Sequence, residues 1–312
     1  MLISTMKKIS NFFKRSWHFI FVVVCILIVV FIGISEHDAK IKQANVQKEI
    51  SNGKLSKNEL NKNGILVLCY HRVSESNKTL SAQLTLNLSN NEQLHEYTVS
   101  KQTLEKQILY LKKNNVKIIS MEKAIQLVKK GKPMKHKYVV FTFDDVDRTI
   151  VDNVDPLFKK LGNIPYTIFI VTQNTGRYDN GTKLATWDEL HQVLKNSNVT
   201  IGVHTNKMHY LINNKPALKY ANNYNEFVKD YKKSQQIIQK HMGHKTPYLA
   251  YPYGEGTAKE QKYLAKQGMY TFSLDNGIIT QDQDLTQPLP RTMVDKKTWN
   301  DVVKKWVGND EQ

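Results

Sequence analysis

The segment Val139–Asp145, with the sequence VVFTFDD, is an apolar, β-branched and aromatic run that ends in two adjacent carboxylates. This composition predicts a buried strand, with Asp144 and Asp145 at the point where the strand opens into a loop. Neighbouring side chains at a strand end point in different directions, so one carboxylate can bind a cation while the other handles a proton. A structural explanation also exists, because acidic residues often form turns after strands, and Asp147 could cap a following helix.

Two histidines follow a second apolar stretch farther along the chain. Val199–Val203 precedes the sequence HTNKMH, which places His204 and His209 after another predicted strand. Histidines at such spacing are often plain surface residues. One carboxylate plus two imidazoles, however, leaves open coordination positions on a metal, as catalysis by a metal-activated water requires. The sequence therefore predicts a divalent metal site at these strand ends.

Strands and helices alternate along most of the chain. Predicted strands lie at 65–73, 116–120, 139–145, 166–171, 199–203, 248–251 and 270–274, and predicted helices at 100–113, 121–130, 149–161, 187–195, 222–242 and 257–267. Repeated βα units imply a parallel sheet, and six or more favour a closed or nearly closed barrel with its site at the carboxyl ends of the strands. The predicted fold class is α/β, a deformed or incomplete (β/α) barrel of about seven strands preceded by a single N-terminal transmembrane helix.

An apolar segment near the N-terminus predicts a membrane anchor. Residues 17–35 are apolar almost throughout, and the preceding basic residues place the N-terminus in the cytoplasm by the positive-inside rule. The predicted organisation is a cytoplasmic basic tail at 1–16, a transmembrane anchor at 17–35, a polar stalk at 36–63 and one domain at 64–312. The domain would lie outside the cell at the membrane. The alternative is secretion after signal cleavage, against which stand the length of the apolar run and a poor cleavage site.

Charge and cysteine content fit an extracytoplasmic protein. The formal net charge is +17, and an excess of this kind suits solubility or attraction to anionic wall polymers and lipid headgroups. Nucleic acid is not an expected partner, because no binding motif occurs and an anchor would keep the domain away from it. Cys25 lies in the apolar run and Cys69 in a predicted strand, so no disulfide joins two parts of the domain and a hydrophobic core must hold it together.

A third predicted strand end carries aromatic residues and a Pro-Gly turn. The segment Tyr248–Gly254, with the sequence YLAYPYG, could be an ordinary tight turn. Alternatively it forms a loop whose aromatic faces and backbone amides meet a sugar and its oxyanion. Tyr251, Tyr253 and Gly254 are therefore the predicted substrate-binding residues.

Four segments taken together resemble the polysaccharide deacetylases of the NodB-homology group, carbohydrate esterase family 4. They are FTFDD at 141–145, IPYTIF at 164–169, TWDEL at 186–190 and IGVHT at 201–205. The resemblance runs in order from about Ile65 to Val294. Within the family, YHRV at 70–73, Asp-Asp-Val in place of Asp-Asp-Gly, the Tyr-Pro-Tyr-Gly segment and the histidine spacing are similar to the biofilm poly-β-1,6-N-acetylglucosamine deacetylases.

The resemblance assigns roles to the polar residues. It implies that Asp145, His204 and His209 bind one divalent metal ion and that Asp144 is the general base. Zinc suits these ligands, and Co²⁺, Ni²⁺, Fe²⁺ or Mn²⁺ could occupy the same site. The base would take a proton from the water that attacks the N-acetyl carbonyl. With the metal, the backbone N–H of Tyr253 would stabilise the oxyanion, a contribution on the order of 3 kcal/mol per donor.

The chain departs from the wider family at three places. Ala250 stands where the family has an arginine that orients the base, and Arg291 is predicted to replace that arginine. The family's late Leu-x-x-His motif is missing, so His71 is predicted to act as the general acid or to orient a neighbour, with a buried structural histidine as the alternative. Val146 replaces a glycine, which implies that the backbone there needs no positive φ.

The predicted function is metal-dependent N-deacetylation of exported poly-β-1,6-N-acetyl-D-glucosamine, which releases acetate and leaves free amines on a biofilm polysaccharide. Two alternatives stay open: deacetylation of peptidoglycan or a chitin-like β-1,4 polymer, and a non-catalytic protein that binds the cell wall. The non-catalytic alternative predicts loss of a metal ligand or of the base, whereas all of these residues are present. A metallopeptidase is disfavoured because the sequence has no His-Glu-x-x-His helix.

Overall fold

The computed structural model describes residues 55–75, 98–179, 182–196 and 198–308. These ranges belong to one unit of the chain, Ile50–Gln312. The predicted cytoplasmic tail, the predicted transmembrane anchor and the stalk as far as residue 54 lie outside the described residues. Within the described ranges, no helix has both the length and the apolar character that crossing a bilayer requires.

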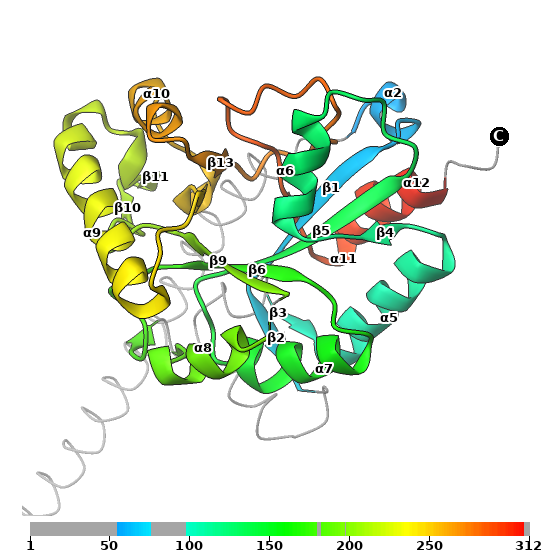
Figure 1. Ribbon diagram of the computed structural model, residues 1–312, viewed down its shortest axis with the longest axis horizontal. Coiled ribbons are helices and arrows are strands. Elements are labelled where there is room, and N and C mark those ends of the chain that lie inside the picture. Colours follow the sequence, from blue (N-terminus) through cyan, green and yellow to red (C-terminus); the bar gives the residue numbers. More distant parts are fainter. Residues whose placement is uncertain (1–54, 76–97, 180–181, 197, 309–312) are drawn as a thin grey trace, which may run out of the picture. The chain divides into compact units, whose positions relative to one another are not determined.

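A parallel sheet forms the centre of the described structure (Figure 1). Its strands follow the order β13-β12-β9-β6-β5-β1-β14, and β4 pairs alongside β5. The strands of this sheet are β1 Gly64–Tyr70, β4 Lys117–Ile118, β5 Lys137–Asp144, β6 Tyr166–Ile170, β9 Val199–Val203, β12 Tyr248–Ala250, β13 Tyr270–Phe272 and β14 Thr292–Met293. Three two-stranded ribbons accompany it: β2 Arg72–Ser74 with β3 Thr98–Ser100, β7 Tyr178–Asp179 with β8 Thr182–Lys183, and β10 Leu211–Ile212 with β11 Lys215–Pro216.

Helices connect the strands, and α5, α7, α8 and α9 surround one side of the sheet in Figure 1. The α-helices are α2 Lys57–Leu60, α5 Lys101–Lys113, α6 Met121–Lys129, α7 Asp155–Lys160, α8 Trp187–Leu194, α9 Tyr224–Met242, α10 Ala258–Lys266, α11 Lys296–Thr298 and α12 Lys304–Gly308. Short 3₁₀ or π turns occur at η1 Ile150–Val154, η2 Ala217–Lys219, η3 Ala221–Asn223, η4 Pro252–Gly254 and η5 Trp299–Val303.

The predicted α/β class and the parallel, incomplete barrel are confirmed. The end strands β13 and β14 are not paired with each other in the described structure, and residues 273–291 cross between them. Single bridges tie this crossing segment to the sheet, Ile65 with Ile279 and Phe272 with Leu289. The sequence analysis did not predict β14 or the C-terminal helices, because a two-residue strand and short helical turns leave no periodic pattern.

Alternation along the central strands divides the core into two clusters. Leu66 and Phe141 belong to a large cluster that includes the apolar faces of α5 and α8. Val67 and Val140 belong to a second cluster that includes residues of α6 and β12. Because side chains alternate along a strand, the side of β5 that carries Val140 also carries its final residue, Asp144. The Asp144 carboxylate therefore lies on the same buried face of β5 as Val140 and points into the barrel.

The predicted stalk overlaps the folded part of the chain. Leu55 is buried in the larger core cluster, and the indole N–H of Trp306 donates to the carbonyl oxygen of Lys62 across 3.0 Å. Residues 55–63, including α2, therefore pack on the domain, so its structure begins before the predicted boundary at Gly64.

A buried carboxylate in α10 generates a prediction about stability. Glu260 is fully buried, one of its oxygens accepts the backbone N–H of Thr257, and its other oxygen has no hydrogen-bond partner. Burial, opposed by the Thr257 hydrogen bonds, raises the pKa of Glu260 to about 7. Because the folded state holds this proton more tightly than the unfolded state, stability should fall between about pH 4.5 and 7 and then stay level.

Glu260→Gln should therefore raise the free energy of unfolding at pH 8 by up to about 3 kcal/mol. At pH 5 or below the two proteins should converge, because wild-type Glu260 is then protonated when folded. Urea unfolding at both pH values measures this, with Glu226→Gln at an exposed position of α9 as the control. An equal stability change at both pH values would contradict the prediction.

Candidate active site

A buried ion pair holds the last residue of β5. Arg291 donates from Nη1 to Oδ1 of Asp144 across 2.7 Å and from Nη2 to Oδ2 across 2.8 Å. Both side chains are almost completely buried, at 0% and 1% exposure. Arg291 also donates to the carbonyl oxygen of Ser273 and to the hydroxyl of Thr142. The residue expected from sequence to replace the family arginine thus lies against Asp144, in a bidentate geometry that fixes the plane of the carboxylate.

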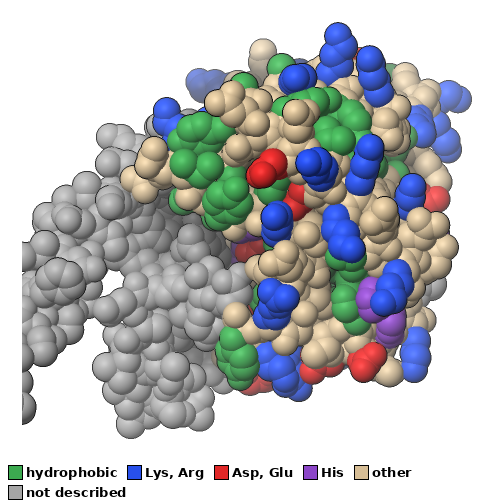
Figure 2. All heavy atoms as spheres, turned by 90° about the vertical axis from the view of Figure 1, so that its left-hand side faces the viewer, with side chains coloured by type: hydrophobic (Ala, Val, Ile, Leu, Met, Phe, Trp, Pro, Cys, Tyr) green, Lys and Arg blue, Asp and Glu red, His purple; other side chains and the backbone are tan. Residues whose placement is uncertain are grey.

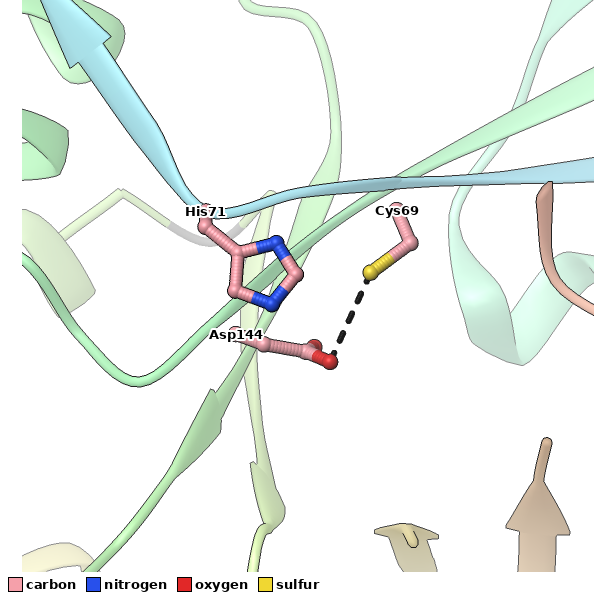
Figure 3. Close-up of side chains that lie close together, drawn as sticks. All are labelled: Cys69, His71 and Asp144. Atoms are coloured by element: carbon pink, nitrogen blue, oxygen red, sulfur yellow. Dashed lines mark hydrogen bonds between the residues drawn. The ribbon is translucent and has the colours of Figure 1, made fainter. Parts of the chain in front are cut away.

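A cysteine absent from the predicted site completes the surroundings of Asp144. The Cys69 thiol donates to Oδ2 of Asp144 across 3.4 Å, and the polar atoms of Cys69, His71 and Asp144 lie within 4.8 Å of one another (Figure 3). Burial raises the pKa of the Cys69 thiol well above its usual value, so the thiol keeps its proton as a donor. Burial alone would raise the pKa of Asp144, but the charge of Arg291 outweighs it and holds that pKa far below normal. Asp144 is therefore a carboxylate at all ordinary pH values.

Asp145, His204 and His209 converge beside this ion pair. Oδ1 of Asp145 lies 3.3 Å from Nε2 of His209 and 3.7 Å from Nε2 of His204. Nε2 of His204 also lies 3.8 Å from Oδ2 of Asp144. The three residues predicted as metal ligands therefore form one group whose ligand atoms lie within 4.8 Å of one another.

The geometry of this group suits a divalent cation. Oδ1 of Asp145 is a buried oxygen without a hydrogen bond, although two imidazole nitrogens face it. Nδ1 of His204 lies 2.8 Å from the carbonyl oxygen of Ala250, which fixes this nitrogen as the donor and turns Nε2 into the site. Burial lowers the pKa of His204 to about 4, so its imidazole is neutral and able to bind a metal near pH 7. An unpaired carboxylate oxygen beside two imidazoles is what a bound cation would satisfy.

The loops after β5, β9 and β12 turn through left-handed backbone conformations. Apart from asparagines, the non-glycine residues with positive φ in the described ranges are Asp145 at 67°, Val146 at 64°, Thr205 at 71° and Tyr253 at 57°. All four lie in the loops that carry the site, and two of them are β-branched. Each such residue costs about 1–2 kcal/mol, so packing elsewhere must hold these loops in place.

The expectation for Val146 was wrong. Its φ of 64° is the left-handed value that a glycine would adopt without strain. The Val146 side chain is buried, and its carbonyl oxygen accepts the backbone N–H of Ala185 across 3.0 Å. Apolar burial and this hydrogen bond therefore hold the turn that aims Asp145, where the family uses glycine.

An acidic residue of α9 holds the histidine loop. The carboxylate of Asp230 accepts the backbone N–H groups of Asn206 and Lys207 across 2.7 and 2.8 Å. Burial raises the pKa of Asp230 despite these two hydrogen bonds. The sequence analysis did not identify this residue, although an acidic residue between Phe227 and Tyr231 on the buried face of the helix was the available signal.

The three predicted substrate-binding residues occupy different environments. The Tyr253 ring lies 4.8 Å from the ring of His209, centroid to centroid, at the edge of the group formed by Asp145, His204 and His209, the candidate metal-binding group. Tyr251 is buried at 1% exposure and donates its hydroxyl to Gln261 across 2.7 Å. Gly254 has a φ of 78°, and a Cβ on it would lie 2.6 Å from the backbone nitrogen of Leu274. Sugar contact by these residues stays a prediction, while the described contacts of Tyr251 and Gly254 shape the loop.

His71 reaches the site from the segment that follows β1. Its imidazole points toward Asp144 in Figure 3. Burial lowers its pKa, while the carboxylates of Asp144 and Asp145 oppose that effect. The structure therefore places His71 within reach of the reacting groups, as a general acid requires, and its catalytic role stays a prediction.

Comparisons with known proteins agree with this site. The family model for polysaccharide deacetylases matches residues 131–272, which include the end of β5 and the histidine loop. A poly-β-1,6-N-acetyl-D-glucosamine N-deacetylase of Staphylococcus epidermidis is 31% identical over 274 residues, or 87% of this chain and 92% of the relative. A protein of the same name from Staphylococcus aureus is 30% identical over 253 residues, or 80% of this chain and 85% of the relative.

Solved structures share the fold. A structure of IcaB from Ammonifex degensii superposes with a TM-score of 0.69 at 26% identity, covering 79% of this chain and 98% of that one. The deacetylase PplD of Streptococcus pyogenes, solved with acetate, superposes with a TM-score of 0.59 at 19% identity, covering 74% of this chain and 92% of that one.

Removal of Arg291 should destabilise the fold through Asp144. In Arg291→Met the carboxylate is buried without its counter-charge, which should lower the free energy of unfolding by about 3–5 kcal/mol. Adding Asp144→Asn should recover at least about 2 kcal/mol of this loss, because a neutral amide needs no counter-charge. Urea unfolding of the two single variants and the double variant gives the coupling energy. If the double variant loses the sum of the unfolding free energies lost by the two single variants, the prediction is wrong. Arg148→Met, at a partly exposed site, serves as the control.

Loss of either imidazole should abolish tight metal binding. His204→Ala and His209→Ala should each weaken Zn²⁺ affinity by at least about 100-fold, since loss of an outer partner already costs 10- to 100-fold. Competition with a chromophoric chelator measures the affinity, and circular dichroism monitors folding. His244→Ala changes an exposed histidine and should leave the affinity unchanged. Equal affinities in all four proteins would show that these imidazoles do not bind the metal.

Proposed function

This chain belongs to the polysaccharide deacetylase family, and we propose that it removes N-acetyl groups from poly-β-1,6-N-acetyl-D-glucosamine outside the cell. The observation that carries the proposal is the placement of Asp144, clamped by Arg291, next to the group formed by Asp145, His204 and His209. The relatives named for this polymer match the chain over most of their own length, which supports the choice of substrate.

The residues divide the hydrolysis between them. A divalent cation bound by Asp145, His204 and His209 would polarise the acetyl carbonyl and acidify a water molecule. Asp144 takes the proton of that water at Oδ2, the oxygen that faces His204 across 3.8 Å. The oxygen of the water then adds to the carbonyl carbon. As the carbon–nitrogen bond breaks, the amine takes a proton and acetate leaves.

His71 is the proposed donor of the proton to the departing amine. The polar atoms of its imidazole lie within 4.8 Å of those of Asp144 and Cys69. Burial lowers its pKa, while the carboxylates of Asp144 and Asp145 oppose that effect and favour the protonated imidazole that a general acid needs. The backbone N–H of Tyr253, whose ring lies beside the His209 ring, is the proposed second donor to the oxyanion.

Zinc is the proposed metal, because two imidazoles and a carboxylate form a ligand set common in catalytic zinc sites. Cobalt, nickel, iron or manganese could occupy the same ligands. We further propose that residues 17–35 anchor the chain in the cell membrane, with the catalytic domain outside. Figure 2 shows many Lys and Arg side chains and few acidic ones on the face that carries α9 and α10, which favours attraction to anionic wall polymers.

Asp144→Asn should abolish acetate release while metal binding persists. The amide keeps the size of the carboxylate but cannot take a proton, so the rate on β-1,6-linked N-acetylglucosamine oligomers should fall by at least 100-fold. Enzymatic detection of acetate measures the rate, with and without a chelator. Asp152→Asn, at an exposed position, is the matched control and should retain wild-type activity.

The outcomes separate the competing functions. Faster release from β-1,4 oligomers than from β-1,6 oligomers would replace the proposed substrate with a chitin-like polymer. Wild-type activity in Asp144→Asn would contradict its role as the base. Absence of acetate release by the wild type with every metal tested would favour a non-catalytic wall-binding protein.

A further inference from the structure

A pocket lies beside the site, on the other side of the Tyr251–Gly254 loop. Its volume is about 760 Å³, within the range of small-molecule binding pockets. The walls come from this loop and the residues that follow it, from α10, from the crossing segment after β13 and from the end of η2, and they include Lys219, Glu255, Lys262, Asp275 and Gln287. None of the metal-binding residues lines it.

The pocket shares a wall with the metal-binding group. The ring of Tyr253 faces His209 at 4.8 Å, while Tyr251 and Gly254, its neighbours in the loop, line the pocket. The Tyr251–Gly254 loop follows β12, whose carboxyl end lies at the same edge of the parallel sheet as those of β5 and β9, and this loop lies between the pocket and His209. A long ligand held at the metal can therefore extend over the loop into the pocket.

The chemistry of the walls suits a neutral, hydroxyl-rich ligand. Hydroxyl, amide and charged groups line the pocket, and they can exchange hydrogen bonds with sugar hydroxyls. Three lysines face two carboxylates, which leaves one net positive charge. One of these carboxylates, Glu255, already pairs with Lys219 across 2.6 Å. An N-acetylated sugar carries no charge, whereas a deacetylated sugar carries an ammonium group that Lys262 and Lys266 would repel.

We propose that this pocket is a subsite for N-acetylated sugar units that neighbour the unit being deacetylated. The proposal rests on the proposed function and specifies how the polymer is held. Its consequence is that a free amine on a neighbouring unit weakens binding, so that deacetylation leaves amines spaced along the polymer.

The first test is the dependence of activity on oligomer length, using the full-length chain. For β-1,6-linked N-acetylglucosamine oligomers of increasing length, kcat/KM for acetate release should rise as the pocket becomes filled. Ala265→Trp fills the pocket from α10. It should lower kcat/KM on the pentamer by about tenfold, the worth of one or two hydrogen bonds, and leave the dimer unchanged. An unchanged dependence on length in Ala265→Trp would overturn the proposal.

The second test uses charge changes in place of a bulky side chain, so it remains valid if Ala265→Trp does not fold. Wild-type enzyme should prefer a fully acetylated pentamer over one with a free amine next to the reacting unit. Lys262→Glu/Lys266→Glu should remove or reverse that preference. Lys232→Glu/Lys233→Glu changes the net charge equally at exposed positions of α9 outside the pocket and should keep the preference.

The results discriminate between explanations. Equal loss of the preference in both double variants would assign it to overall charge and overturn the subsite. Loss of binding to a long-chain polyphosphate in Lys262→Glu/Lys266→Glu, with the preference intact, would assign these lysines to an anionic polymer and also overturn it. If the wild type releases acetate from no oligomer, the proposed function itself fails.

Discussion

The buried ion pair between Asp144 and Arg291 is the interaction on which the rest of the site depends. Two charges removed from water are costly even when paired, and apolar residues of similar size could often replace such a pair without loss of stability. The pair joins the end of β5 to the segment that enters β14, across 147 positions of sequence. The same contact therefore fixes the position of the segment that closes the barrel and the orientation of the Asp144 carboxylate.

This ion pair also limits the chemistry that is open to Asp144 in its proposed role as the base. The guanidinium and the Cys69 thiol donate to a carboxylate whose pKa is far below its usual value. Such a group has little affinity for a proton, so it can act only on a nucleophile that is already acidic. The neighbouring Asp145, by contrast, has a buried oxygen without a hydrogen bond. The two adjacent carboxylates thus differ in environment because only one of them meets Arg291, and this difference supports the separate roles proposed for them.

The sequence predicted the site where side-chain chemistry and strand alternation were sufficient. The end of an apolar strand located Asp144, and the missing family arginine pointed to Arg291. Val146 was misjudged because the usual preference for glycine at positive φ yields to burial and a backbone hydrogen bond, which no local pattern reveals. Cys69 and Asp230 were missed because each looks like an ordinary strand or helix residue until the fold brings it to its partner.

The irregular closure of the barrel explains how a site for a polymer can arise at its edge. The end strands β13 and β14 are not paired with each other, and the described segment between them joins the sheet through isolated bridges and through buried side chains such as Leu289 and Arg291. That same segment supplies Arg291 to the interior and Asp275 and Gln287 to the pocket. Since a chain-like substrate must pass beyond the reacting unit on at least one side, an open edge next to the metal-binding group is a geometric requirement. The proposed subsite makes this gap in the sheet part of the substrate-binding surface.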